Sequence, residues 1–429
     1  MVLRTLSFGL AVSLAAFAAT DVTFTKDVNP ILQKRCQSCH RPGEVGPMAL
    51  LTYQQARPWA KAMREAVLLK KMPPWFADPH YGTFSNNPSL TQAEIDTFVN
   101  WAAAGAPEGD PKDLGKPVEF VDGWNIGKPD LVIEMPNAFP VPATGYVDYQ
   151  TIVIPTHFKQ DMWVQAAELR PGNRAVVHHV TAFARQPGSL AYADAKPGIP
   201  FRQDREKQRT LTRDIDRPEY VVGYTPGRPA SLFVPGEARL IKAGSDIVLS
   251  LHYTPNGKAT EDKTKIGFIF AKEVPKRRVV NVMLADPNIL IPPGEPNYRT
   301  DASLTLQEPA TLVRLWPHMH TRGKFYEYRV VFPTGESQVI LRVPNFDFGW
   351  QLSYNLEKPL YLPKGTRLEG TAYFDNSPNN PNNPDPKQEV HWGEQSWDEM
   401  SEGYMDMAVE PNIGPGDLRR AKETTAALN

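Results

Sequence analysis

Residues 247–257 read Ile247-Val248-Leu249-Ser250-Leu251-His252-Tyr253-Thr254-Pro255-Asn256-Gly257. An apolar run of this length that ends at a Pro-Asn-Gly turn is typical of a buried β-strand, because proline and glycine terminate strands and form tight turns. Similar runs occupy residues 149–154, 162–169, 311–316, 326–332 and 368–374, and most are bounded by further Pro-Gly-type turns. The pattern predicts antiparallel β-sandwiches or barrels over much of the chain.

The composition supports a multidomain, turn-rich protein. The 429 residues suggest about two to four domains, at ~100–200 residues per domain. The 42 prolines and 29 glycines argue against a helical bundle for most of the chain. With 47 Lys+Arg against 48 Asp+Glu, the net charge of -1 offers no global basic field, so we expect no nucleic-acid partner.

The N-terminus has the pattern of a secretory signal peptide over residues 1–19. Arg4 precedes an apolar segment at residues 6–15, and Ala16-Phe17-Ala18-Ala19 offers small residues for cleavage. The apolar segment is shorter than the ~20 residues of a membrane-spanning helix, and no later segment approaches that length. We therefore expect a periplasmic or secreted protein without a stable membrane span.

The two cysteines lie together in Cys36-Gln37-Ser38-Cys39-His40. Cys-x-x-Cys-His is the attachment signature of c-type haem, in which two thioethers hold the porphyrin and the histidine ligates iron. The alternatives are a thioredoxin-like pair, whose βαβ flanks are missing here, and a zinc site, which would need two further ligands nearby. The motif thus predicts one covalent haem.

A downstream methionine is the expected sixth iron ligand. Met72 is the first candidate, because the following Pro73-Pro74-Trp75 excludes a helix and stiffens the loop. Met48 is the second candidate, whereas Met63 lies in a helical stretch and is expected in the core. Thr91-x-x-Glu94 is a capping box that predicts a helix from there to about residue 104.

This part of the chain resembles the small class I-like c-type cytochrome domains that are fused to periplasmic bacterial oxidoreductases. The resemblance rests on the haem motif, on Arg41-Pro42-Gly43 directly after it and on Met72-Pro73-Pro74-Trp75. The resemblance covers residues 22–108 and implies a small all-α domain that transfers single electrons. Residues 109–129, rich in proline, glycine and aspartate, are expected to form a linker.

Five further histidines lie within the predicted strands or at their ends. His318 and His320 are two residues apart, so on a strand they would project to the same face and could hold one metal ion. His178 and His179 are adjacent and would face opposite sides of a regular strand, so joint ligation by this pair needs a bulge or a strand end. Taken singly, each group is also compatible with hydrogen-bonded structural histidines.

The ordered set His178-His179, His252, His318-x-His320, Met400 resembles the copper type II, ascorbate-dependent monooxygenase family of peptidylglycine alpha-hydroxylating and dopamine beta-monooxygenases. The resemblance implies two jelly-roll-like antiparallel sandwiches, at residues 130–280 and 281–415, followed by a tail at 416–429. It also implies two copper ions, one held by the first three histidines and one by the remaining groups. Imidazole and thioether ligands suit copper.

By the same resemblance, the copper at His318, His320 and Met400 carries the catalytic chemistry with O₂ and an unidentified organic substrate. The other copper stores an electron, and we expect the haem to replace ascorbate as its source, fed by a periplasmic or membrane donor.

Two alternatives stay open: a periplasmic copper-binding or electron-transfer protein without oxygenase activity, and a haem-bearing interaction module with structural histidines. Met405 and Met407 are candidate core residues, His391 is expected to be structural or to support a ligand, and His157 and His80 are unassigned.

Overall fold

The computed structural model describes residues 22–121, 123–203, 218–226 and 230–419. The expected signal peptide at 1–19 and the end of the expected tail, 420–429, lie outside these ranges. The described chain divides into a helical unit and a larger unit that contains the strands. Most of the described secondary structure is β-sheet, as the sequence predicts. In the described ranges, no helix has the length and apolar character needed to cross a membrane.

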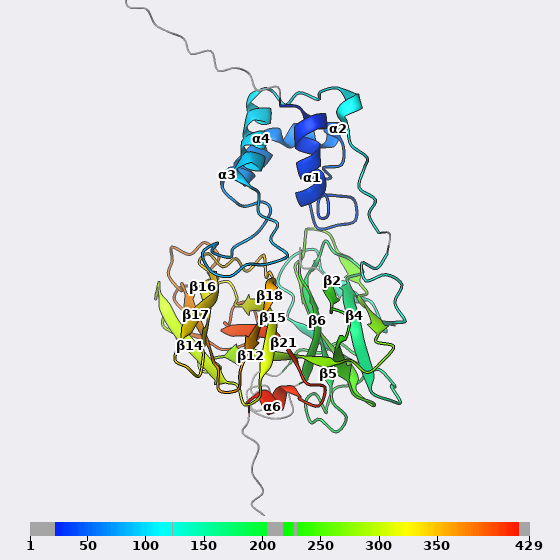
Figure 1. Ribbon diagram of the computed structural model, residues 1–429, viewed down its shortest axis with the longest axis vertical. Coiled ribbons are helices and arrows are strands. Elements are labelled where there is room, and N and C mark those ends of the chain that lie inside the picture. Colours follow the sequence, from blue (N-terminus) through cyan, green and yellow to red (C-terminus); the bar gives the residue numbers. More distant parts are fainter. Residues whose placement is uncertain (1–21, 122, 204–217, 227–229, 420–429) are drawn as a thin grey trace, which may run out of the picture. The chain divides into compact units, whose positions relative to one another are not determined.

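The helical unit comprises the described residues up to Pro42 together with Gly46–Pro73 and Ser89–Val118. The predicted capping box is present: the Glu94 amide donates to Thr91 Oγ1 and the Thr91 amide donates to Glu94 Oε2. The helices pack through a small apolar core. Its segments are η1 (Phe24–Val28), α1 (Asn29–Arg35), α2 (Tyr53–Ala56), η2 (Arg57–Trp59), α3 (Ala60–Leu68), α4 (Gln92–Ala103) and η3 (Pro111–Asp113) (Figure 1).

Two segments inside the expected cytochrome range, Gly43–Val45 and Pro74–Pro88, belong to the β unit instead. Trp75 and Phe84 pack against Tyr354, with ring centroids 4.8 and 5.5 Å from it. The range 22–108 is therefore interrupted in space, because partly buried aromatic residues after Pro73 pack against a β core rather than against the helices.

The described strands of the β unit form one long sheet, two four-stranded sheets and two two-stranded sheets. One short sheet has the order β3 (Gln150–Pro155), β9 (Asp246–Tyr253), β5 (Val177–Arg185), β6 (Glu219–Tyr224). The other has the order β14 (Tyr298–Thr305), β19 (Arg367–Phe374), β16 (Gly323–Val331), β17 (Ser337–Val343). All six apolar runs predicted as strands are confirmed: they coincide with β3, β4, β9, β15, β16 and β19.

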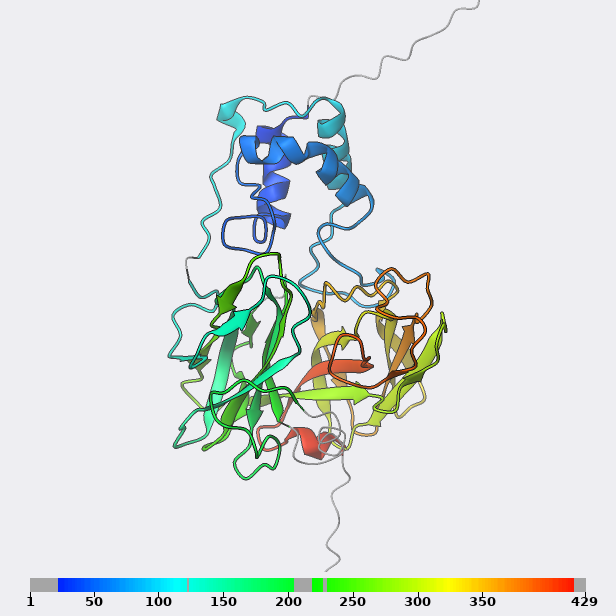
Figure 2. The same ribbon diagram turned by 180° about the vertical axis from the view of Figure 1, so that it is seen from behind.

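The long sheet runs through both halves of the β unit (Figure 2). Its order is β1 (Leu131–Glu134), β11 (Lys265–Phe270), β4 (Met162–Arg170), β8 (Glu237–Ile241), β12 (Arg277–Ala285), β21 (Glu402–Val409), β15 (Ala310–His318), β18 (Tyr354–Leu362), with β7 (Ser231–Leu232) beside β4. Two-stranded pieces pair β2 (Phe139–Val141) with β10 (Thr260–Asp262) and β13 (Leu290–Ile291) with β20 (Val390–His391). A final helix, α6, spans Pro415–Arg419.

The two halves each contain a separate apolar core. One core draws on β3, β9, β5 and β6 and on β1, β11 and β4, and the other draws on β14, β19, β16 and β17 and on β12, β21, β15 and β18. The join is a short parallel pairing of β8 with β12, where Arg277 faces Glu237 and Arg278 faces Ala238. The boundary expected between residues 280 and 281 falls inside β12, so the halves share a sheet instead of being joined by a loop.

Candidate metal centre

His178 and His179 lie at the start of β5, and His252 lies near the end of the adjacent strand β9. The pairing of the two strands is irregular here: Val177 faces Tyr253 and His179 faces His252, with a register shift between them. The extra residue of this bulge is His178. A bulge turns a side chain away from its regular face, which removes the obstacle that the sequence posed for two adjacent histidines.

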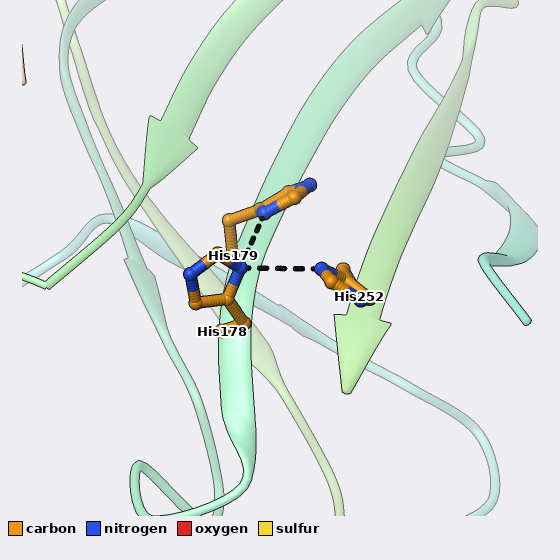
Figure 3. A group of neighbouring side chains, drawn as sticks. All are labelled: His178, His179 and His252. Carbon is orange, nitrogen blue, oxygen red and sulfur yellow. Dashed lines mark hydrogen bonds between the residues drawn. The ribbon is translucent and has the colours of Figure 1, made fainter. Parts of the chain in front are cut away.

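The three imidazoles of this group converge (Figure 3). The Nδ1 atom of His178 lies 3.2 Å from Nδ1 of His252 and 3.2 Å from Nδ1 of His179. One nitrogen from each ring lies within 4.8 Å of the others, which is a spacing that could hold a metal ion. His179 and His252 are buried, so a cation here would be shielded from water.

Burial also sets the protonation state of this group. Desolvation lowers the pKa of His178 to about 4 and that of His252 to about 3, and it lowers the pKa of His179 well below its usual range. The neighbouring imidazoles add to this effect, because a second positive charge at this distance is unfavourable. All three rings are therefore neutral at pH 7, which is the form that binds metals.

His318 ends β15, and His320 follows in the turn before β16. His318 Nδ1 lies 2.6 Å from Gln351 Oε1, and His320 Nδ1 lies 3.1 Å from the Asp398 carbonyl oxygen. Both acceptors require the proton on Nδ1, so Nε2 keeps its lone pair in each ring. Nε2 of His320 is buried and has no hydrogen-bond partner among the described residues. Such an orphaned acceptor, with its tautomer set by the other nitrogen, is typical of a metal ligand.

Met400 is buried and lines a cavity together with this pair. The preceding residue, Glu399, accepts hydrogen bonds from the amides of His320 (2.8 Å) and Arg322 (2.7 Å). The methionine segment is therefore fastened to the turn that carries His320. Met400, His318 and His320 line the same cavity, together with His179. Met405 and Met407 are fully buried in a core, as the sequence allows.

The two groups of histidines lie close together. The ring centroids of His179 and His318 are 6.2 Å apart. Tyr149 stacks on His252 at 4.4 Å and lies 6.4 Å from His320. Five imidazoles from both halves of the β unit thus share one environment.

The other histidines lie elsewhere. His391, on β20, has a half-exposed side chain 3.3 Å from Glu389. His80 is 82% exposed and contacts Asp78, and His157 is exposed after β3. None belongs to the group of five.

In the helical unit, Cys36 directly follows α1, and the amides of Cys39 and His40 donate to the Cys36 carbonyl at 3.1 and 2.9 Å. This turn brings the three residues of the motif together. His40 Nδ1 lies 3.1 Å from the Met48 carbonyl oxygen, which leaves Nε2 for a ligand role. Gly46 lies against the same ring, because a Cβ there would be 2.7 Å from His40 Nδ1.

The candidate sixth ligands differ in their surroundings. Met48 and Met63 pack against the helical core. Met72 lies half-buried in the loop after α3, outside that core. Burial raises the pKa of the Cys36 thiol to about 12, so the free thiol is protonated at pH 7.

Sequence reasoning missed three residues that contact the candidate ligands or their turn. Gln351, Glu399 and Tyr149 act only through tertiary contacts, and Gln351 lies in a loop without a motif. Glu399 directly precedes Met400 in the sequence, but nothing in the sequence indicates that its carboxylate accepts hydrogen bonds from the amides of His320 and Arg322.

Comparisons with known proteins bear on neither the fold nor the function. No family profile matches the chain, and no curated protein matches it. Among solved structures, the VP2 subviral particle of infectious bursal disease virus aligns at 11% identity over 68% of this chain and 75% of that chain, with a TM-score of 0.19. PNGF-II aligns at 10% identity over 65% of each chain, with a TM-score of 0.26. Similarity at this level carries no argument.

Proposed function

We propose that this chain is an exported, haem- and copper-containing oxidoreductase that uses O₂ to hydroxylate a C–H bond of an organic substrate. The observation that carries the proposal is the group of five neighbouring histidines, with Met400 lining the same cavity as three of them. In this reading, the helical unit is a c-type cytochrome domain and the halves of the β unit are jelly-roll-like sandwiches.

The residues divide into two proposed copper sites. His178, His179 and His252 offer three nitrogens at one point, and His318 and His320 offer Nε2 with the Met400 thioether nearby. This mixed imidazole and thioether set suits copper better than magnesium or calcium, which prefer oxygen ligands. When bound, copper supplies the one-electron steps and the O₂ activation that amino-acid side chains lack.

The chain itself contributes orientation and exclusion of water. Gln351 and the Asp398 carbonyl hold the His318 and His320 rings, while Glu399 fixes the turn between them and Met400. The cavity beside these groups is lined in part by aromatic rings. Hydroxylation places one oxygen atom of O₂ in the product and reduces the other to water, which requires two electrons from a donor. Cys36, Cys39 and His40, with Met72, would hold a c-type haem, and this group would supply the one-electron transfer that such a delivery needs.

The test separates electron delivery from oxygen chemistry. Exchanging His40 for Ala or Met72 for Leu is expected to abolish O₂ consumption with a reduced periplasmic cytochrome as the donor and to retain it with ascorbate. His320→Ala should abolish both. If the haem variants lose both activities while their copper content is unchanged, the proposal that the haem only delivers electrons and the copper sites carry the oxygen chemistry is wrong. If the wild-type chain retains copper and consumes no O₂ with any donor, the alternative of a copper-binding or electron-transfer protein is favoured.

A further inference from the structure

A loop rich in asparagine and proline connects β19 to β20. We call residues 375–388 the asparagine loop; its central part reads Asn-Ser-Pro-Asn-Asn-Pro-Asn-Asn-Pro. A connection of this composition is expected to run over the surface, exposed to water. Asn376 is instead fully buried, and Ser377 is buried beside it. Since a buried polar side chain must find partners inside the protein, the partners of Asn376 show what the loop is attached to.

The side chain of Asn376 has a complete set of hydrogen bonds. Its Oδ1 atom accepts from Arg322 Nε at 2.8 Å and from Asn383 Nδ2 at 3.1 Å. Its Nδ2 atom donates to the carbonyl oxygens of Pro292 and Gln388, both at 2.9 Å. Both donors and both acceptor sites of the amide are used. Removing this side chain would therefore leave several buried groups without partners, which is costly.

Arg322 lies in the turn between His320 and β16 and is 2% exposed. Besides the bond to Asn376, its guanidinium donates to the carbonyl oxygens of Trp397 at 2.9 Å and of Asp385 at 3.4 Å. The donors of a guanidinium point in fixed directions, so one arginine can join several segments in a defined arrangement. This buried side chain therefore joins the asparagine loop to the segment that leads to the candidate methionine ligand.

Further hydrogen bonds connect the same three segments. Asn380 Nδ2 donates to the Thr321 carbonyl oxygen at 3.2 Å and to that of Asp375 at 2.9 Å. The Asp375 amide donates to the Arg322 carbonyl oxygen at 2.8 Å. The Thr321 hydroxyl donates to the Ser396 carbonyl oxygen at 3.2 Å. The turn after β15 is thus bonded to the asparagine loop on one side and to the segment before Met400 on the other.

These bonds matter because a methionine ligand is not positioned by its own side chain. Methionine has three rotatable bonds, so the place of its sulfur depends on how firmly its backbone segment is held. No disulfide can hold this segment, because both cysteines of the chain belong to the haem motif. The group of His178, His179 and His252 differs, since the pairing of β5 with β9 fixes it.

We propose that the asparagine loop is a clamp that holds the segment of Met400 against the turn of His320, with Asn376 and Arg322 as positioning residues. This inference rests on the proposed function, because it takes Met400 and His320 as ligands of one copper ion. The clamp acts on the backbone segments that carry the two ligands, and it gives a role to a loop that the proposed chemistry leaves unused.

Hydrogen exchange in the copper-free, haem-matured full chain tests the clamp without metal. Asn376→Leu removes its four side-chain bonds, and Asn379→Ala changes an exposed asparagine of the same loop. The backbone amides of residues 319–323 and 396–401 should exchange faster in the Leu variant and unchanged in the control, because lost bonds favour local opening. Unchanged exchange in the Leu variant would overturn the clamp. If that variant does not fold, Asn380→Ala, which removes two bonds, serves in its place.

Copper binding by the same variants tests the positioning role. Asn376→Leu should weaken one of the two bound copper ions ~10–100-fold in competition with a chelator, as is typical when the support of a ligand is lost. X-ray absorption of the reduced copper should show the loss of its sulfur neighbour. Asn376→Asp keeps the acceptor for Arg322 and should retain more of the sulfur signal, and Asn379→Ala should retain all of it.

Two results would separate this inference from the proposed function. Faster exchange in Asn376→Leu, with copper affinity and sulfur signal unchanged, would overturn the positioning role and leave the copper sites standing. A wild-type chain that binds no copper would overturn the proposed function, and the exchange comparison would then decide the clamp by itself.

Discussion

At the residue scale, the candidate ligands follow from the sequence pattern, whereas the residues that hydrogen-bond to them do not. The order of the histidines and the methionine can be read in the sequence. In the structure, one group contains His178, His179 and His252. Met400 lines the same cavity as His318 and His320. The hydrogen bond from His318 to Gln351 joins residues 33 positions apart. No spacing rule predicts such a contact, because it depends on where a loop returns.

Gln351 should matter through the tautomer of His318. Gln351→Leu removes the acceptor for Nδ1–H, and loss of such a support typically lowers metal affinity ~10–100-fold. Gln351→Glu retains an acceptor and should lose much less. Competition titration with a copper chelator measures both. Equal affinity of the Leu variant and the wild-type chain would show that Gln351 does not orient the ring.

The raised pKa of Glu399 predicts that the free energy of unfolding decreases toward alkaline pH. Burial raises its pKa to about 8 in the folded chain, from 4.5 in the free side chain. The folded state therefore holds this proton more tightly than the unfolded state, so the stability it contributes is lost as the pH rises from about 4.5 through 8, by up to ~1.4 kcal/mol per pH unit. Urea unfolding of the metal-free chain between pH 6.5 and 8.5 should show this decline, and Glu399→Gln should flatten it. An identical slope in the variant would refute this assignment.

The lowered pKa values of the buried histidines predict that the free energy of unfolding decreases toward acid pH. The folded pKa values of about 4 for His178 and about 3 for His252 lie below the unfolded value of 6.5. Their stabilisation is therefore present above pH 6.5 and is lost as the pH falls toward 4, because the unfolded chain binds the protons more readily. The urea midpoint should decrease between pH 6.5 and 4.5 in the metal-free chain. The exposed-histidine variant His80→Gln should keep the same decrease, and a flat wild-type profile would contradict the account.

At the scale of the elements, strand positions were predictable and sheet pairing was not. The six apolar runs correspond to strands because burial on the sheet selects apolar residues locally. The pairing of β8 with β12 involves two residue pairs and has no local signature. From the sequence, a bulge at His178 could only be named as something that joint ligation by adjacent histidines requires. The pairing of β5 with β9 contains this bulge.

Close packing around β21 gives a prediction for this element. A Cβ at Gly403 would lie 2.2 Å from the Tyr326 hydroxyl oxygen, and Tyr326 is fully buried in a core. Gly403→Ala should therefore destabilise the chain by ~1–3 kcal/mol, as is typical for overpacking. Gly115→Ala, where nothing lies within 4 Å of the added Cβ, serves as the control. The midpoints of thermal unfolding of the two variants measure the difference in stability. Equal midpoints would mean that the sheet accommodates the added methyl group at Gly403 without cost.

At the scale of the whole molecule, the chain forms a helical unit with the haem motif and a β unit with the histidine groups. The return of residues 74–88 to the β unit was not predictable, because Trp75 and Phe84 find their partner Tyr354 about 270 positions later in the sequence. The central claim is that one chain carries one haem and two copper ions.

The most direct test is the metal content of the exported, haem-matured protein, with copper and iron counted per chain by elemental analysis. We expect about two copper ions per covalent haem, with one lost in His320→Ala and the other in His252→Ala. One iron and no copper per chain would contradict the account, and the proposed oxygen chemistry would have to be withdrawn.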